Sequence, residues 1–407
     1  MGYTDSKSSP LGNLKMIDLK FDGNASNKTE SSQAQYRGKI LLSINTSWNI
    51  YNFRRGLIQS LIAAGYEVVV ASPYDQYSSR LADLGCRHIP VSIDSKGTSP
   101  LRDLALLINF IRIIRRERPN AFLGWTIKPN VYGSVAARAF AIPTLNNVSG
   151  LGTAFINTTL LTRIAENLYR FAFRRSGCVL FQNEDDRALF LNRNIVRAEQ
   201  AGLVPGSGVD LSQFSPRSAK IVGKRELTFL LIARVLWDKG IGEYVEAARL
   251  VKKDFPHVRF QLLGPLDSLN RTAVSSSVVS GWVKEGVIEY LGTTDDVRPF
   301  IDQSDCIVLP SYREGTPRTL LEAAAMAKPL IATNVPGCKN VVNHGENGFL
   351  CEIRNAVDLS KKIEDFVKLS PAVRTLMGKK SRELAERRFD ERFVINAYLS
   401  ALERLLQ

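Results

Sequence analysis

The chain has 407 residues, of which 44% are hydrophobic and 23% are charged, and this is the composition of a globular protein long enough to bury more than one core. No apolar run reaches the roughly 18 residues that a membrane-spanning helix needs. The five cysteines are widely spaced and form no C-x-x-C pair, which argues against a disulfide framework and predicts reduced thiols in the cytoplasm. The net charge of +14 favours anionic partners, namely phosphorylated ligands, polyanions or an anionic lipid surface.

The chain begins with a polar stretch, residues 1–37, that is rich in Ser, Asn, Lys and Gly and predicts a disordered tail. Strand and helix patterns then alternate from Lys39 onward, and such alternation predicts an α/β fold with parallel sheets. The segment after the first strand, residues 46–55, is expected to be a loop at the carboxyl edge of the sheet, where ligands of such folds bind. A glycine-containing junction at residues 206–208 precedes a second alternation from Leu227, so we predict two domains.

Two stretches of the first half combine arginine with apolar residues. Residues 160–175 mix Arg163, Arg170 and Arg174 with leucine and aromatic side chains, a pattern typical of helices that lie on a membrane surface. The alternative is that the apolar side packs on the sheet and the arginines only face solvent. An arginine cluster at residues 112–118 allows the same two interpretations.

The most informative stretch is residues 305–337. A short apolar run, Cys306 to Leu309, predicts a buried strand, and a helical pattern follows, with Thr316 as the expected N-cap and Pro317 as the first helical residue. The amides at the start of such a helix are suited to a phosphate or a diphosphate. Two carboxylates, Glu314 and Glu322, flank that start; they would repel phosphate but can accept hydrogen bonds from sugar hydroxyls.

The strand, the EGTP turn, the helix rich in small residues and two glutamates separated by seven residues resemble the signature of retaining glycosyltransferases of family four, the glycosyl transferases group 1. Residues 126–155 resemble the matching segment in members that extend lipid-linked oligosaccharides at bacterial membranes. The resemblance covers residues 38–405. It implies a GT-B fold, with two Rossmann-like doubly wound domains facing a central cleft: an acceptor domain at 38–208, a nucleotide-sugar donor domain at 209–388 and a helix at 389–407 that crosses back to the first domain.

The resemblance also implies roles for individual residues. The catalytic set would be Glu314, which positions the donor sugar, with Arg234 and Lys239, which take the charge of the leaving diphosphate. The donor would also be bound by Glu322 at the ribose and by Arg318, Thr319, Leu320, Gly264, Leu291 and Ser207. The acceptor would be bound by Asn52, Lys128, Ser149, Gly150 and Asn183. Many members have two glycines in the first loop, whereas this chain has none before Gly56, so only the location of that loop carries over. Capping of the next helix is the alternative role for Asn183.

Neither a nucleophile nor a general base stands out; in the family, the departing phosphate is thought to receive the proton of the acceptor. Without a His or Cys cluster or an Asp-x-Asp pattern, no metal and no other cofactor are expected. The implied donor is a nucleotide sugar, with UDP favoured, and the sugar is a hexose or an N-acetylhexosamine. The implied acceptor is a polyprenyl-diphosphate-linked glycan, which places the protein in the cytoplasm, peripheral on the inner face of the cell membrane, with no nucleic acid partner.

Two alternatives remain at this stage. A GT-B sugar-nucleotide epimerase would need acid and base side chains in its cleft, and this chain has only three histidines. A non-enzymatic polyanion-binding protein would explain the basic charge, but it would leave the EGTPRTLLE segment without a role.

Overall fold

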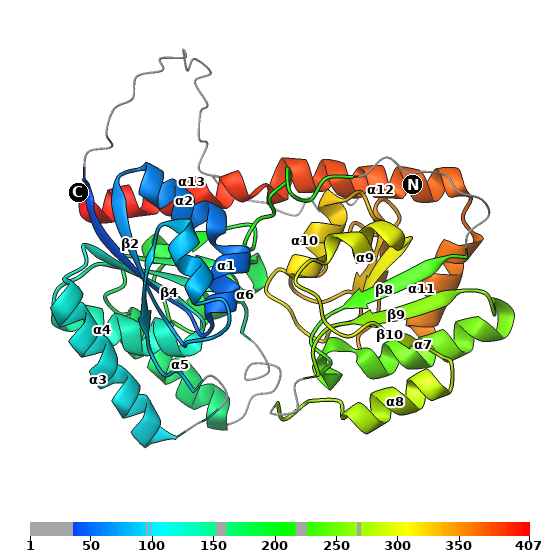
Figure 1. Cartoon of the computed structure of the whole chain (residues 1–407), viewed down its shortest axis with the longest axis horizontal. Coiled ribbons are helices and arrows are strands. Elements are labelled where there is room, and N and C mark those ends of the chain that lie inside the picture. Colours follow the sequence, from blue (N-terminus) through cyan, green and yellow to red (C-terminus); the bar gives the residue numbers. More distant parts are fainter. Residues whose placement is uncertain (1–35, 95–96, 98, 152–159, 217–225, 267–269) are drawn as a thin grey trace, which may run out of the picture. The chain divides into compact units, whose positions relative to one another are not determined.

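The computed structural model describes residues 36–94, 97, 99–151, 160–216, 226–266 and 270–407. The expected disordered tail lies outside these residues, except for its last two positions. Residues 36–407 form one contact unit, which contains two parallel sheets flanked by helices (Figure 1). This is the α/β architecture that the alternating pattern predicts.

Among the described residues, the first sheet has seven strands in the order β3-β2-β1-β4-β5-β6-β7, all paired in parallel. Its strands are β1 (Gly38–Ser43), β2 (Tyr66–Ser72), β3 (Arg87–Pro90), β4 (Ala121–Trp125), β5 (Thr144–Val148), β6 (Cys178–Phe181) and β7 (Ala201–Leu203). The helical segments are α1 (Ser47–Phe53), α2 (Arg55–Ala63), η1 (Ser79–Leu84), α3 (Pro100–Glu117), η2 (Pro129–Gly133), α4 (Ser134–Ala139), α5 (Leu160–Phe173), α6 (Glu184–Asn192) and η4 (Ala198–Gln200). The strand order reverses between β1 and β4, so loops that follow these strands flank a crevice.

The second sheet has six strands in the described part of the chain, in the order β10-β9-β8-β11-β12-β13. They are β8 (Thr228–Ile232), β9 (Arg259–Leu263), β10 (Glu289–Tyr290), β11 (Cys306–Leu309), β12 (Leu330–Thr333) and β13 (Gly348–Cys351). Its helical segments are η5 (Trp237–Lys239), α7 (Ile241–Asp254), α8 (Ser276–Lys284), α9 (Arg298–Gln303), α10 (Arg318–Ala325), α11 (Ala356–Lys368), α12 (Pro371–Leu384) and η6 (Ala385–Phe389). Here the order reverses between β8 and β11.

The last helix, α13 (Glu391–Leu406), packs against the first sheet although it follows the second in sequence (Figure 1). Its buried face includes Tyr398 and Leu402, which join the core formed by β1, β2 and β4. Trp125 at the end of β4 donates from Nε1 to the Tyr398 hydroxyl at 2.9 Å. Phe389, just before α13, belongs instead to the core of the second sheet. The chain therefore passes back to the first sheet within a few residues after Phe389.

The segment at residues 46–55 differs from the expected loop, because most of it is the helix α1. Thr46 caps this helix by accepting a hydrogen bond from the amide of Asn49 at 3.1 Å, and Ile50 is fully buried. α2 starts directly afterwards at Arg55. The prediction of a loop was wrong because a capping threonine and one buried apolar side chain suffice for two helical turns here.

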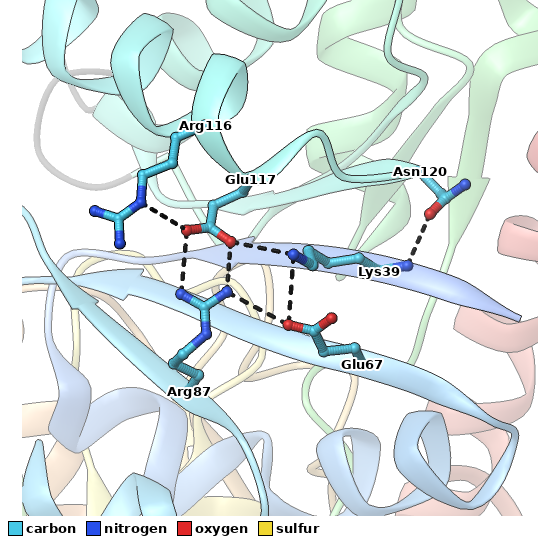
Figure 2. Close-up of polar contacts among 6 residues, drawn as sticks. All are labelled: Lys39, Glu67, Arg87, Arg116, Glu117 and Asn120. Atoms are coloured by element: carbon cyan, nitrogen blue, oxygen red, sulfur yellow. Dashed lines mark hydrogen bonds and ion pairs between the residues drawn. The ribbon is translucent and has the colours of Figure 1, made fainter. Parts of the chain in front are cut away.

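The amino ends of the first strands carry a network of charged side chains, which we call the amino-edge network: Lys39, Glu67, Arg87, Arg116 and Glu117 (Figure 2). At its centre, Glu117 is 7% exposed. Arg87 donates to both of its oxygens, and Lys39 Nζ lies 3.2 Å from Oε2. These hydrogen bonds lower the pKa of Glu117 to about 2. The network ties β1, β2 and β3 to the end of α3, at the edge opposite to the one where ligands of such folds bind.

Candidate functional site

The candidate site lies at the carboxyl ends of β8 and β11, the neighbouring strands at which the order of the second sheet reverses. The loop after β8 contains Arg234 and η5, and the loop after β11 contains Glu314 and leads into α10. Such a reversal opens a crevice at the carboxyl edge of a sheet, and ligands of doubly wound folds bind there. The topology therefore places the two sequence motifs on the two sides of one crevice.

Glu314 and Lys239 are in direct contact. Lys239 Nζ donates to Oε1 of Glu314, and the hydroxyl of Ser311 donates to the same oxygen at 2.6 Å. The side chain of Lys239 is only 20% exposed and that of Glu314 only 14%. Gly240 allows this approach, because it has a φ of +71° and a Cβ there would come within 2.1 Å of the Pro310 carbonyl oxygen. Two of the three expected catalytic residues are thus brought together.

Arg234, the third expected catalytic residue, is exposed two positions after the end of β8. Gly264, at the end of β9, packs against the same loop: its φ is +149°, and a Cβ would come within 1.8 Å of the Ala233 carbonyl oxygen. Leu291 follows β10 and donates its amide to the Leu262 carbonyl at 2.9 Å. Gly264 and Leu291 therefore lie at the same edge of the sheet as Arg234.

The helix α10 begins at Arg318, one residue later than expected, and its N-cap is Pro317, which makes no side-chain cap. Thr316 does not cap the helix as predicted. Its hydroxyl donates to the carbonyl of Gln182, at the end of the first sheet, at 2.9 Å. Because α10 begins at Arg318, Thr316 lies one residue before the cap position, and this later start is the reason that the prediction failed.

Glu322 is 8% exposed within α10, and its Oε1 accepts from Nε of Arg318, one turn earlier, at 2.8 Å. Burial raises the pKa of Glu322, and the Arg318 charge opposes this shift. Arg318 also donates from Nη1 to the carbonyl of Gly208 at 2.5 Å and to the hydroxyl of Ser207 at 3.3 Å. Three of the expected donor-binding residues, Arg318, Glu322 and Ser207, therefore form one connected group.

The other two expected donor-binding residues of α10 use their side chains for packing. The Thr319 hydroxyl donates to the carbonyl of Ile232 at 3.1 Å, which fastens the helix to the end of β8. Leu320 is fully buried in the core of the second sheet. Only the backbone amides of these two residues are suited to a ligand, as the sequence hypothesis assumed.

Three of the five residues expected to bind the acceptor contact the Glu314 turn. Asn183, the N-cap of α6, donates from Nδ2 to the carbonyl of Gly315 at 2.8 Å. A Cβ on Gly315 would come within 2.3 Å of the Ser149 carbonyl oxygen. Gly150 has a φ of +123°, and a Cβ there would lie 3.0 Å from the Gly315 amide nitrogen. Ser149, Gly150 and Asn183 thus form a wall for the turn.

The remaining two acceptor candidates make their hydrogen bonds elsewhere. Lys128 forms an ion pair with Asp103 at 2.5 Å, and Asp103 also accepts from the hydroxyl of Tyr132 at 2.9 Å. Asn52 lies on α1 and donates to the carbonyl of Trp48, one turn earlier, at 2.9 Å. Neither is joined to the Glu314 turn by a hydrogen bond in the described part of the structure.

Sequence reasoning missed Arg313 and its contact with Asp186. Arg313 Nη2 donates to Oδ1 of Asp186 in the first turn of α6, across 127 residues of sequence. Asp186 is fully buried, and burial raises its pKa, opposed by the charge of Arg313. The one available signal was position, because Arg313 directly precedes Glu314 and Asp186 follows Asn183 by three residues.

Within the described ranges, no group of three or more His, Cys, Asp or Glu side chains is arranged to hold a metal ion. The same part of the chain contains no helix with the length and apolar character needed to cross a membrane.

Both halves of the chain match known families. Residues 39–183 match the family described as glycosyl transferase 4-like, and residues 226–368 match glycosyl transferases group 1. An N,N'-diacetylbacillosaminyl-diphospho-undecaprenol alpha-1,3-N-acetylgalactosaminyltransferase from Campylobacter jejuni is 27% identical, over 88% of this chain and 96% of the relative. A UDP-Gal:alpha-D-GlcNAc-diphosphoundecaprenol alpha-1,3-galactosyltransferase from Escherichia coli is 23% identical, over 70% of this chain and 76% of the relative.

Solved structures share the fold. A glycosyltransferase from Rickettsia africae superimposes with a TM-score of 0.73 at 19% identity, over 92% of this chain and 99% of that one. Anabaena HepE, solved in complex with UDP and glucose, gives a TM-score of 0.72 at 17% identity, over 89% and 98% of the two chains. The matches to both families and the doubly wound sheets agree: the chain is a GT-B glycosyltransferase, with a glycosyl transferase 4-like half at residues 39–183 and a glycosyl transferases group 1 half at residues 226–368.

Proposed function

We propose that this glycosyltransferase moves a hexose or an N-acetylhexosamine from a UDP-sugar to a polyprenyl-diphosphate-linked saccharide, with retention of anomeric configuration. The observation that carries the proposal is the contact between Glu314 and Lys239 at the reversal point of the second sheet, next to the start of α10. The names of the two relatives support the lipid-linked acceptor, and one of them also names a UDP-sugar donor.

The proposed role of each residue at this edge follows from its charge. Lys239 and Arg234, with the first amides of α10, would stabilise the negative charge that develops on the leaving diphosphate. Fixed cations can do this without a divalent ion, so we propose that the reaction needs no metal. When the donor binds, its phosphates would replace Glu314 as the partner of Lys239. The sugar hydroxyls would replace Lys239 as hydrogen-bond donors to the carboxylate of Glu314.

Glu322 would accept hydrogen bonds from the ribose hydroxyls. Arg318 donates to this carboxyl group at 2.8 Å, and its positive charge opposes the rise in pKa that burial causes. The departing phosphate itself would receive the proton of the acceptor hydroxyl, since no dedicated base is required if both substrates are held in contact.

The acceptor would lie at the carboxyl edge of the first sheet, and Asn52 and Lys128 remain our candidates for contacting it. Ser149, Gly150 and Asn183 would act on the acceptor side by shaping the wall next to Glu314. A polyprenyl diphosphate is anchored in a bilayer, so this part of the proposal requires an approach to the membrane surface.

The helix α5 offers a surface for that approach. Its inner side is packed, because Tyr169 and Phe173 are fully buried. Its outer side still exposes Phe171 by 55% and Ile164 by 48%, next to exposed arginines such as Arg170. An exposed aromatic and aliphatic side chain flanked by cations suits the headgroup region of an anionic bilayer. We therefore propose a peripheral location on the inner face of the cell membrane.

The transfer reaction tests the proposal directly. The purified protein would be incubated with labelled UDP-glucose, UDP-galactose and their N-acetylated forms, together with a polyprenyl-diphosphate-linked saccharide, with and without EDTA. We expect one donor to give a labelled lipid product whose new linkage has the α configuration of the donor, with undiminished yield in EDTA. UDP release without an acceptor would favour the epimerase, and the absence of any turnover would favour a polyanion-binding protein.

The membrane contact needs its own test. We expect the protein to float with vesicles that contain phosphatidylglycerol at moderate salt, and the double substitution Ile164→Ser and Phe171→Ser to reduce flotation while transfer to a detergent-solubilised acceptor is kept. Flotation that does not depend on these two side chains would contradict the role of α5.

A further inference from the structure

The turn that carries Glu314 is held from the first sheet on both sides of that glutamate. Before it, Arg313 donates to Asp186; after it, the carbonyl of Gly315 accepts from Asn183 at 2.8 Å. One position further, the Thr316 hydroxyl donates to a first-sheet carbonyl at 2.9 Å. We call these contacts the clasp; it consists of Gln182, Asn183 and Asp186 on one side and Arg313, Gly315 and Thr316 on the other.

Helix capping alone does not account for Asp186. Asn183 caps α6 by accepting from the amide of Asp186 at 2.8 Å, and its Nδ2 lies 3.1 Å from Oδ2 of Asp186. Such a cap forms equally well at a solvent-exposed helix end, so capping does not require the burial of Asp186, which is complete. A buried carboxylate is costly unless a cation compensates its charge. Arg313 is that cation, and its own side chain is only 17% exposed.

The side chain of Glu314 is held by the other sheet, through Lys239 and Ser311. The neighbours of Glu314 in sequence are therefore fixed by one half of the molecule and its carboxylate by the other. The turn has little room to shift between them. A Cβ on Gly206 would come within 2.7 Å of Thr316, and a Cβ on Gly337 within 2.2 Å of the Gly315 carbonyl oxygen.

We propose that Asp186 and Arg313 are positioning residues, which hold the Glu314 turn against the first sheet and thereby orient the carboxylate at the place where donor and acceptor meet. This inference rests on the proposed function of Glu314. Neither residue is proposed to touch the reacting atoms. Arg313 acts through the backbone before Glu314, and Asp186 acts through Arg313 on that side and through Asn183 on the other.

A second ion pair between the same two regions provides a matched control. Asp185, next to Asp186 on α6, pairs with Lys339 at 2.9 Å, but their side chains are 37% and 39% exposed. Exposed pairs of this kind contribute little to stability because water and salt screen them. Asp185→Asn therefore removes a charge from the same helix turn without opening the clasp.

The experiment compares Asp186→Asn, Arg313→Gln, the double variant and Asp185→Asn by hydrogen–deuterium exchange and steady-state transfer kinetics. We expect amides of residues 311–316 to exchange about tenfold faster in both single variants, and kcat to fall about 10- to 100-fold. The KM for the donor and the affinity for UDP should change less than about twofold, because the donor contacts lie in the second sheet. The kcat of the double variant should fall no further than that of the less active single variant, since both substitutions remove the same contact. Asp185→Asn should keep kcat within about twofold.

Unchanged exchange at residues 311–316, or kcat losses that multiply in the double variant, would overturn the proposal. So would a parallel rise of exchange over all of α6 and β6, which would show that Asp186 only stabilises the first domain. If Asp186→Asn does not fold, Arg313→Gln decides alone, because Arg313 lies on a loop. The exchange measurement needs no substrate. A protein that transfers no sugar would therefore refute the proposed function, and the exchange at residues 311–316 would still decide whether Asp186 and Arg313 hold the turn.

Discussion

Glu117 in the amino-edge network and Glu322 at the candidate site are equally buried, at 7% and 8% exposure, yet their pKa values shift in opposite directions. Glu117 is met by two cations, Arg87 and Lys39, which donate three hydrogen bonds to it, and its pKa falls to about 2. Glu322 accepts from one cation, Arg318, and burial raises its pKa. For Glu117 the donated hydrogen bonds outweigh the effect of burial, whereas for Glu322 burial outweighs the single cationic donor.

The same contrast separates the two edges as a whole. Asp186 at the site edge is also buried with one cation, and burial again raises its pKa. At the amino edge, the charges neutralise one another within the protein and serve its stability. At the site edge, Glu322 has fewer partners and retains a capacity to accept hydrogen bonds from a ligand, whereas Asp186 belongs to the clasp. The substitutions below test this division, from the largest expected effect to the smallest.

Glu314→Gln should have the largest effect on activity and little effect on stability. The amide keeps the shape of the side chain but removes the charge that pairs with Lys239 and orients the sugar. We expect kcat to fall by about 100- to 1000-fold, the range found when a preorganised electrostatic contact is removed from an active site. Steady-state transfer kinetics and a Tm measurement on the same preparation would check this; a kcat within threefold of the wild type would remove Glu314 from catalysis.

Glu117→Gln should show the reverse pattern. It weakens charge-assisted hydrogen bonds to Arg87 and Lys39, each worth about 1.5–3 kcal/mol when buried. Because Arg87 is half-exposed, solvent screens part of this, and we expect a loss of about 2 kcal/mol in urea unfolding. kcat should stay at the wild-type value. A loss of activity at unchanged stability would contradict the assignment of the amino edge to stability.

The pH dependence of stability follows from the same residue. The pKa of Glu117 is lower in the folded protein, about 2, than its ordinary value of 4.5, so the unfolded chain binds the proton more tightly. Its stabilising contribution is complete above pH 4.5 and is lost as the pH falls toward 2. Urea unfolding between pH 5.5 and 3 should therefore show a smaller loss of stability in Glu117→Gln than in the wild type. An identical loss in both would refute the low pKa.

Glu322→Gln is expected to act on ligand binding more than on folding. Its raised pKa means that the ionised carboxylate is already disfavoured by burial, so replacing it with a neutral amide should change the unfolding free energy by less than about 1 kcal/mol. A charged acceptor for the ribose hydroxyls would be lost, and we expect UDP to bind about tenfold more weakly. Isothermal titration with UDP would measure this. An unchanged affinity would exclude the ribose role.

Local patterns predict the sheets of this molecule well and its site contacts poorly. The strand at Cys306–Leu309 lies where its apolar run places it, because burial of consecutive apolar residues is a local property of the sequence. The contact of Thr316 with Gln182 was not predicted, because the two residues lie 134 positions apart. The contact between Asp186 and Arg313 was not predicted for the same reason. The proximity of Glu314 and Lys239 was expected only through resemblance to a family, since no spacing rule joins residues 75 positions apart.

Glu67→Gln tests the periphery of the amino-edge network and should have the smallest effect. Like Glu117, Glu67 pairs with both cations: its Oε1 lies 3.5 Å from Lys39 Nζ and 3.4 Å from Arg87 Nη2 (Figure 2). Unlike that of Glu117, the side chain of Glu67 is 40% exposed. Exposed ion pairs contribute about 0–1 kcal/mol, so we expect a change in unfolding free energy below about 0.5 kcal/mol and no change in kcat. If Glu67→Gln destabilised the protein as much as Glu117→Gln, the network would act as one cooperative unit, and the number of donors to Glu117 alone would not explain the stability of this edge.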